Sequence, residues 1–497
     1  MVSLLYNGKA EEADKEQQAF FTDFNLDQII KAITDDSDLD IKELYFQVPA
    51  NKETEDYRRA IFQDIKKDSV HDSMSVFLDC MRQQEECAVS KDKLDEKRQQ
   101  QVWFIREVSC YVKAVEALQA CLQTKAYQSE GFSLFHVWLA GYMDSGEYVE
   151  LKSEVTALEQ ELRGFRILLS YENGKFTVED ASTEEAAYED FLTECFPENK
   201  KALKSPFLGS GEWAELEERA IGLFAKKHKE FFHRAEQFWK QYQTYQKEEI
   251  KALPKELSYY MAYLRFMKKL EQKGLHFCIP ATGGETLAAK GLYDLALAYV
   301  SLEEEKEVVP NDFELFPEEK FIVLTGPNQG GKTTFARSLG QLVYFTKMGL
   351  DVPAAEAVVP YYTEILTHFS VEESVETGRG KLLEELSRLK PMMQQEKKGA
   401  FVIINELFTT AANADACVMG RKVLEYFIDN GCKGIYVTHL NELSTAHPLV
   451  VSFRATTDEE NRQTYKVARQ QAVETAGAIL QVEKYHLTYQ QIKERFS

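Results

Sequence analysis

The segment GPNQGGKTT, residues 326–334, restricts the possible folds more than any other part of the chain. It fits the pattern G-x-x-x-x-G-K-[ST], and it follows an apolar run, KFIVLTG, and precedes a stretch of helical character. A strand, a glycine-rich loop and a helix in this order form a phosphate site, because the loop amides and the helix N-terminus face the anion. The residues expected to contact a nucleotide here are Gly326, Pro327, Asn328, Gln329, Gly330, Gly331, Lys332, Thr333 and Thr334.

The last residues of this motif predict the cofactors, which are ATP and Mg²⁺. Lys332 is expected to reach the β- and γ-phosphates, and the Thr333 hydroxyl is expected to bind Mg²⁺. A mostly parallel α/β sheet is the expected setting, because short apolar runs alternate with helical stretches after about residue 320. These runs are KFIVLTG at 320–326, YTEILTHF at 362–369, AFVIINE at 400–406 and GIYVTH at 434–439.

The run FVIINELFTT, residues 401–410, ends a buried strand in Asn405-Glu406. Nucleotide-hydrolysing proteins often end such a strand with an acid that holds Mg²⁺, followed by a Glu that orients water. Glu406 is therefore a candidate catalytic residue together with Lys332, and His439 is a candidate sensor of the γ-phosphate. Asn405 can offer its amide oxygen to Mg²⁺ or to a metal-bound water, but it brings no negative charge. We expect an active but slow ATPase.

The first 250 residues are expected to be helical. Residues 96–123 have no Pro or Gly, and their apolar positions recur at helical spacing. Residues 221–245 carry an a/d seam of mostly aromatic residues, which favours packing against a partner helix over stacking on nucleic acid. Pro254 is expected to break this helix. The predicted domains are a helical core at 1–125, a helical lever or coiled-coil region at 126–250 and an α/β P-loop ATPase domain of ABC-like type at 251–497.

Composition restricts the class of protein and its partners. A chain of 497 residues is too long for one core, so several domains are expected. The formal net charge of −22 argues against a general polyanion binder, but it leaves room for a local basic groove. The eight cysteines form no C-x-x-C pair, which is typical of reduced thiols in a cytoplasmic protein. No signal peptide and no membrane span are expected.

The C-terminal half resembles the MutS-type mismatch-repair ATPase family. TGPNQGGKTTFAR is close to the T-G-P-N-M-G-G-K-S-T loop of that family, and THL at 438–440 matches its T-H-Y in the histidine. VVPNDFELF is similar to the segment before the loop, so the resemblance implies an adenine contact by Phe313. Residues 370–386 resemble the signature segment, which in the family touches the nucleotide of a partner subunit; the matching positions are Thr377, Gly378 and Arg379.

The chain departs from the family pattern at several places. Gly380 and Lys381 replace a Ser-Thr pair, Asn405 replaces Asp, and FTTAANAD replaces a loop rich in Gly and Ser/Thr. The tail at 464–496 is similar to the segment that packs the ATPase dimer. The first 150 residues contain no F-x-E wedge, so a short member without the N-terminal mismatch-recognition domain is expected.

Two functions remain open at this stage. The resemblance implies a homodimeric, ATP-gated clamp that binds mismatched, branched or duplex DNA and acts in mismatch repair or in recognition of abnormal DNA structure. The alternative is an ATP-gated protein-interaction switch without direct DNA binding, which the net charge of −22 and the missing wedge favour.

Overall fold

The computed structural model describes residues 2–8, 19–165, 167–172, 175–180, 224–304, 307–369, 380–394, 398–460 and 462–472. The chain forms two compact units. The helical unit comprises Met1–Ser3 and Lys66–Pro254, and the sheet unit comprises Leu4–Ile65 and Lys255–Ser497. One division between the units falls after Pro254. The expected helical core at 1–125 is divided, however, because Leu4–Ile65 folds with the sheets and not with the helices that follow it.

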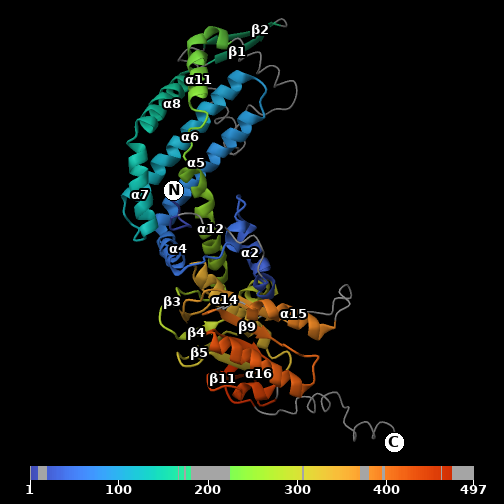
Figure 1. The fold of residues 1–497 in the computed structure, drawn as a ribbon. Coiled ribbons are helices and arrows are strands. Elements are labelled where there is room, and N and C mark those ends of the chain that lie inside the picture. The colour runs from blue at the N-terminus through green and yellow to red at the C-terminus, as the bar shows by residue number, and fades with distance from the viewer. Residues whose placement is uncertain are drawn as a thin grey trace, which may run out of the picture. The chain divides into compact units, whose positions relative to one another are not determined.

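Long helices build most of the helical unit, and α6 packs against both α5 and α8 (Figure 1). Side-chain caps explain several helix starts: Glu96 accepts the Arg98 and Gln99 amides at 2.6 and 2.9 Å, and Ser129 accepts the Phe132 amide at 3.4 Å. The helices are α5 Asp68–Asp92, α6 Lys97–Gln123, α7 Glu130–Met143, α8 Gly146–Gly164 and α11 Lys229–Gln241, and the strands are β1 Ile167–Glu172 and β2 Lys175–Asp180.

The aromatic seam predicted at 221–245 is used for packing. Phe231, Ala235 and Phe238 are buried, and the Phe238 ring lies 5.7 Å from that of Phe104 on α6. The prediction of one continuous helix is wrong in detail, because His228 interrupts the helix and α11 ends at Gln241. Tyr245 lies beyond that end and donates its hydroxyl to the Glu107 carboxylate at 2.8 Å.

The N-terminal helices of the sheet unit pack on α12 (Glu248–Glu271) and α14 (Lys332–Lys347). Tyr45 donates to the Tyr259 carbonyl at 2.6 Å, and Tyr344 donates to the Tyr45 carbonyl at 2.5 Å. The N-terminal helices are α1 Phe20–Asp23, α2 Leu26–Thr34, α3 Lys42–Phe46 and α4 Lys52–Ile65.

The prediction that Pro254 breaks a helix is wrong, because it lies inside α12. Proline removes one amide hydrogen and crowds the carbonyl four residues before it, but a helix can continue past it when tertiary packing offsets that cost. Leu257, Tyr259 and Tyr260 are fully buried just after it and supply that packing.

A six-stranded sheet carries the order β12-β11-β6-β10-β9-β8. The strands from β8 to β11 are parallel to their neighbours, and β12 is antiparallel to β11, which confirms the expected mostly parallel sheet. Its strands are β6 Phe321–Thr325, β8 Ile365–Phe369, β9 Phe401–Asn405, β10 Lys433–Val437, β11 Val450–Thr457 and β12 Gln463–Arg469.

The remaining elements cover or extend this sheet. A four-stranded sheet has the order β3-β7-β4-β5, with bounds β3 Ala281–Thr282, β4 Leu287–Leu292, β5 Asn311–Leu315 and β7 Glu356–Val359. The helices are α13 Leu295–Glu304, α15 Lys381–Gln394, α16 Asn413–Asp429 and the 3₁₀ helix η2 Asn441–Thr445. Among the described residues, no helix is both long and apolar enough to cross a membrane.

Candidate functional site

The glycine-rich loop connects β6 to α14 in a conformation that needs glycine. Gly326 has φ +132°, and a Cβ there would lie 3.0 Å from backbone atoms of Ala455. Gly331 caps α14 with φ +85°, in the left-handed region that glycine adopts without steric cost. The loop amides and the first turn of α14 therefore face the same space, an arrangement that can bind an anion.

Lys332 lies within this loop. Its ammonium group donates to the carbonyl oxygens of Gly326 at 3.0 Å and Pro327 at 2.9 Å. Burial lowers the pKa of Lys332, and the Glu406 charge opposes that effect. A buried cation held only by carbonyl oxygens is well placed to gain energy from an anionic ligand.

Thr333 and Asn405 meet at the carboxyl edge of the sheet. The Thr333 hydroxyl donates to the Asn405 side-chain oxygen at 3.3 Å, and Asn405 is the last residue of β9. Both atoms are neutral oxygen donors of the kind that Mg²⁺ accepts when phosphates supply the negative charge. The donor set therefore fits Mg²⁺ bound together with a nucleotide.

Glu406 directly follows β9 in a strained conformation. Its φ is +56°, a region that costs a residue with a side chain about 1–2 kcal/mol. Its amide donates to the Val437 carbonyl at 2.9 Å, and its carboxylate lies 3.1 Å from His439 Nε2. The Glu406 and His439 side chains are 31% and 45% exposed, so both remain open to solvent. The expected partners from two strand ends are thus brought together.

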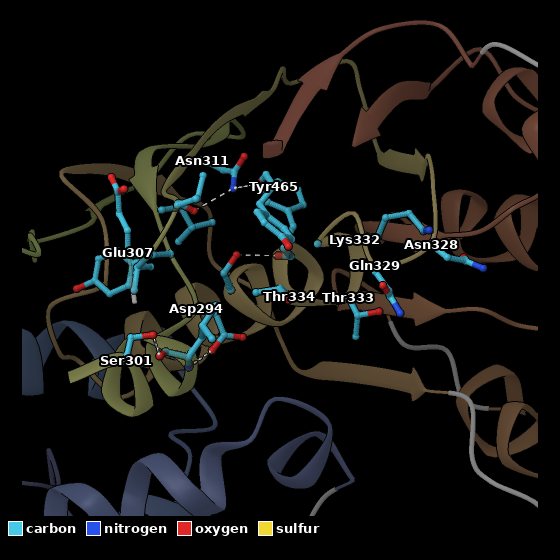
Figure 2. Close-up of a pocket in the computed structure, with 18 of the residues that line it drawn as sticks. Asp294, Ser301, Glu307, Asn311, Asn328, Gln329, Lys332, Thr333, Thr334 and Tyr465 are labelled. Atoms are coloured by element: carbon cyan, nitrogen blue, oxygen red, sulfur yellow. Dashed lines mark hydrogen bonds between the residues drawn. The ribbon is translucent and has the colours of Figure 1, made fainter. Parts of the chain in front are cut away.

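A cavity of about 660 Å³ extends from the loop. Figure 2 shows Asn328, Gln329 and Thr333 on one side, Asp294, Ser301 and Glu307 on the other, and Tyr465 between them. The lining residues are Leu292, Tyr293, Asp294, Leu297, Ser301, Glu307, Val308, Val309, Asn311, Asn328, Gln329, Gly331, Lys332, Thr333, Thr334, Phe335, Ser338, Glu406 and Tyr465. The cavity is large enough for a small-molecule ligand with its anionic end at the loop.

Tyr465 and Asn311 are among the lining residues that sequence reasoning missed. Tyr465 on β12 has φ +54° and is 52% exposed, and its ring would lie 3.6 Å from a Cβ on Gly331. Asn311 holds it there, because its amide group donates to the Tyr465 carbonyl at 3.1 Å and accepts from the Val467 amide at 2.7 Å. No local pattern marks either residue, since β5 and β12 meet only in the fold.

The structure does not bring Phe313 to this cavity. Its ring is buried, 5.8 Å from that of Phe335 on α14, and Val308, Val309 and Asn311 line the cavity instead. The adenine contact of Phe313 therefore stays a prediction that the lining of this cavity does not support. Thr377, Gly378 and Arg379 lie outside the described residues.

Comparison with known proteins relates the sheet unit to one family. Residues 322–486 match the family model described as MutS domain V. The chain is 30% identical over 139 residues to the DNA mismatch repair protein MutS of Thermotoga neapolitana, which is 28% of this chain and 17% of that protein. It is 33% identical over 176 residues to the DNA mismatch repair protein MSH6 of Arabidopsis thaliana, 34% of this chain and 13% of that protein. The alignments thus span less than a fifth of each relative.

Proposed function

This chain belongs to the MutS family through its C-terminal domain, and on that premise we propose that it is an Mg²⁺-dependent ATPase coupled to DNA. The observation that carries the proposal is that Lys332, Thr333 and Glu406 line one cavity at the carboxyl edge of the sheet, where Thr333 is hydrogen-bonded to Asn405. Ligands of parallel α/β sheets bind at this edge. The loop would hold the phosphates, and the Tyr465 ring would stack on the base.

Hydrolysis would depend on the carboxylate of Glu406. A carboxylate that accepts a proton from water raises the nucleophilicity of that water, and His439 at 3.1 Å restrains its orientation. Lys332 would stabilise the charge that develops on the phosphoryl oxygens. Mg²⁺, held by the Thr333 hydroxyl and reached by Asn405 directly or through water, would neutralise phosphate charge. Because Asn405 lacks the usual negative charge, we expect weak metal affinity and slow turnover.

DNA coupling and dimerisation rest on the relatives. The proteins that match this chain are named as DNA mismatch repair proteins, and the resemblance in the signature segment implies a contact between subunits. We propose a homodimeric clamp that uses ATP to change its grip on mismatched, branched or otherwise abnormal DNA.

The test is Mg²⁺-dependent ATP turnover by the purified protein, alone and with perfect duplex, mismatched duplex and four-way-junction DNA at low salt. Stimulation by one DNA form supports the proposal and identifies the preferred structure. Turnover that no DNA changes, together with no DNA binding at low salt, would contradict the DNA coupling and would favour a protein-interaction switch. Absence of turnover at millimolar Mg²⁺ would contradict the ATPase itself.

A further inference from the structure

The turn at residues 406–408, which carries Glu406, has a backbone conformation that neighbouring segments must enforce. Glu406 has φ +56° and Phe408 has φ +65°, so two residues with side chains adopt left-handed backbone conformations on either side of Leu407. Such conformations persist only where the surrounding structure enforces them. The Glu406 amide is tied to β10 through the Val437 carbonyl at 2.9 Å. This bond fixes the start of the turn but leaves its second half to other contacts.

Glu385 on α15 supplies the contact at Phe408. The Glu385 Oε2 atom accepts the Phe408 backbone amide at 3.0 Å, across a sequence separation of 23 residues. Glu385 is 4% exposed and Phe408 is 2% exposed, so water cannot replace this bond without rearrangement. A hydrogen bond from an amide to a carboxylate is stronger than one to a neutral acceptor.

The helix α15 holds Glu385 in place through its buried face. Leu389 and Met392 follow Glu385 at helical spacing, and they pack in the same apolar cluster as Leu407 and Phe408. Apolar contacts are non-directional and tolerate small shifts. The hydrogen bond is directional, so it restrains the orientation of the peptide between Leu407 and Phe408.

We propose that Glu385 is a positioning residue for Glu406, holding the 406–408 turn in the left-handed conformation that directs the Glu406 carboxylate into the cavity. Glu385 is not among the residues that line the cavity, and it acts on Glu406 through the backbone amide of Phe408. The inference rests on the proposed ATPase function of Glu406, and it adds a positioning residue on α15 that supports the turn carrying Glu406.

The test compares variants of Glu385 that differ in the hydrogen-bond acceptor offered to the Phe408 amide. Glu385→Met keeps the length of the side chain and removes the acceptor, whereas Glu385→Gln keeps a neutral acceptor. Glu384→Ala is the matched control, because Glu384 is the preceding residue on α15 and faces Arg388 at 3.4 Å, away from the turn. Each variant is measured for kcat and KM at saturating Mg²⁺, for binding of a fluorescent ATP analogue, and for hydrogen exchange of the Phe408 amide.

The expected result is a kcat that falls by about tenfold or more in Glu385→Met, since small misplacements of a catalytic group are costly. The affinity for the ATP analogue stays within about threefold, a split that general unfolding would not give. Hydrogen exchange of the Phe408 amide accelerates in Glu385→Met. In Glu385→Gln, kcat and the exchange rate return most of the way to the values of the parent. If Glu385→Met does not fold, Glu385→Asp repeats the test, because it withdraws the carboxylate by one methylene.

Failure of the positioning role can be distinguished from failure of the proposed ATPase function. A parent protein that turns over ATP, with unchanged kcat in Glu385→Met, overturns the positioning role and leaves the ATPase intact. A parent without turnover overturns the proposed function, and exchange at Phe408 still tests the bond: unchanged exchange in Glu385→Met overturns this inference as well.

Discussion

The N-terminal and C-terminal ends of α14 differ in how their polar groups are bonded. At its N-terminal end, Gly331 is left-handed, and Lys332 bonds to carbonyl oxygens that a ligand can replace. At its C-terminal end, Lys347 bonds to the Glu55 carboxylate and to the Tyr362 carbonyl, both at 2.7 Å, and the Lys347 and Glu55 side chains are each 4% exposed. One end keeps its polar groups open to a ligand, whereas the other satisfies them internally.

We call the C-terminal end of α14, at Lys347, the closed end, and the N-terminal end, at Lys332, the open end. Contacts at the closed end fix the helix on which the open end depends. Arg59 donates to the Thr346 carbonyl at 2.9 Å, and Tyr259 donates to the Met348 carbonyl at 3.0 Å, so carbonyls at the end of α14 have side-chain partners. Cations at a helix C-terminus also interact favourably with the helix dipole. The contacts for stability and those for ligand binding thus lie at different ends of α14, so substitutions at each end should separate the two properties.

The largest expected effect is on activity at the open end. Glu406→Gln should lower ATP turnover by about 10²- to 10⁴-fold, because it removes the proton acceptor for the attacking water. Binding of ATP and the free energy of unfolding should change little, since this side chain is 31% exposed. The measurement is steady-state phosphate release, with Glu442→Gln, an exposed acid on η2, as control. Retained turnover in Glu406→Gln would place the catalytic base elsewhere.

The next effect is on stability at the closed end. Lys347→Met should lower the free energy of unfolding by about 3–5 kcal/mol, because it leaves Glu55 buried without its charge partner. Urea denaturation measures this, and Lys347→Met combined with Glu55→Met should recover most of the loss, since apolar replacements of a buried pair are often neutral. Turnover per folded molecule should stay near that of the parent. A large fall in kcat at full folding would show that the two ends are not separate.

Tyr465 offers a smaller test of the open end. Tyr465→Ala should weaken ATP binding by about 1–3 kcal/mol, the range measured for stacking of a base on an aromatic ring. The backbone carbonyl of residue 465 keeps its bond to Asn311, so the strand itself should persist. Tyr465→Phe keeps the ring and should bind like the parent. Equal weakening in both variants would point to the hydroxyl and not to stacking.

The smallest effect is a pH dependence that belongs to the closed end. Burial raises the pKa of Glu55 from 4.5 to about 7, against the opposing charge of Lys347. Between these values the folded protein holds a proton that the unfolded chain has released, so stability falls as pH rises from about 4.5 to about 7. The slope contributed by Glu55 is at most about 1.4 kcal/mol per pH unit. Urea titrations of the parent and Glu55→Gln across this range measure it; identical slopes would contradict the shift.

The site was predictable where its signals are local. The loop at 326–334 and the pair Asn405-Glu406 could be assigned because each follows an apolar strand directly, and parallel strands bring their carboxyl ends to one edge. Alternation along β5 indicates that Phe313 is buried but not whether it faces the cavity, and its ring lies against that of Phe335 on α14. Asn311 and Tyr465 could not be found, since their contact joins strands more than 150 positions apart in the chain.

The sequence by itself determined the strand, glycine loop and helix, the mostly parallel sheet and the helical character of residues 96–123. These depend on backbone freedom and apolar periodicity, which are properties of neighbouring residues. Only the tertiary structure decided that Leu4–Ile65 packs with the sheets, that α12 continues through Pro254 and that Glu385 holds the turn after Glu406. In each case buried contacts between distant segments outweigh the local preference, and such contacts leave no periodic trace in the sequence.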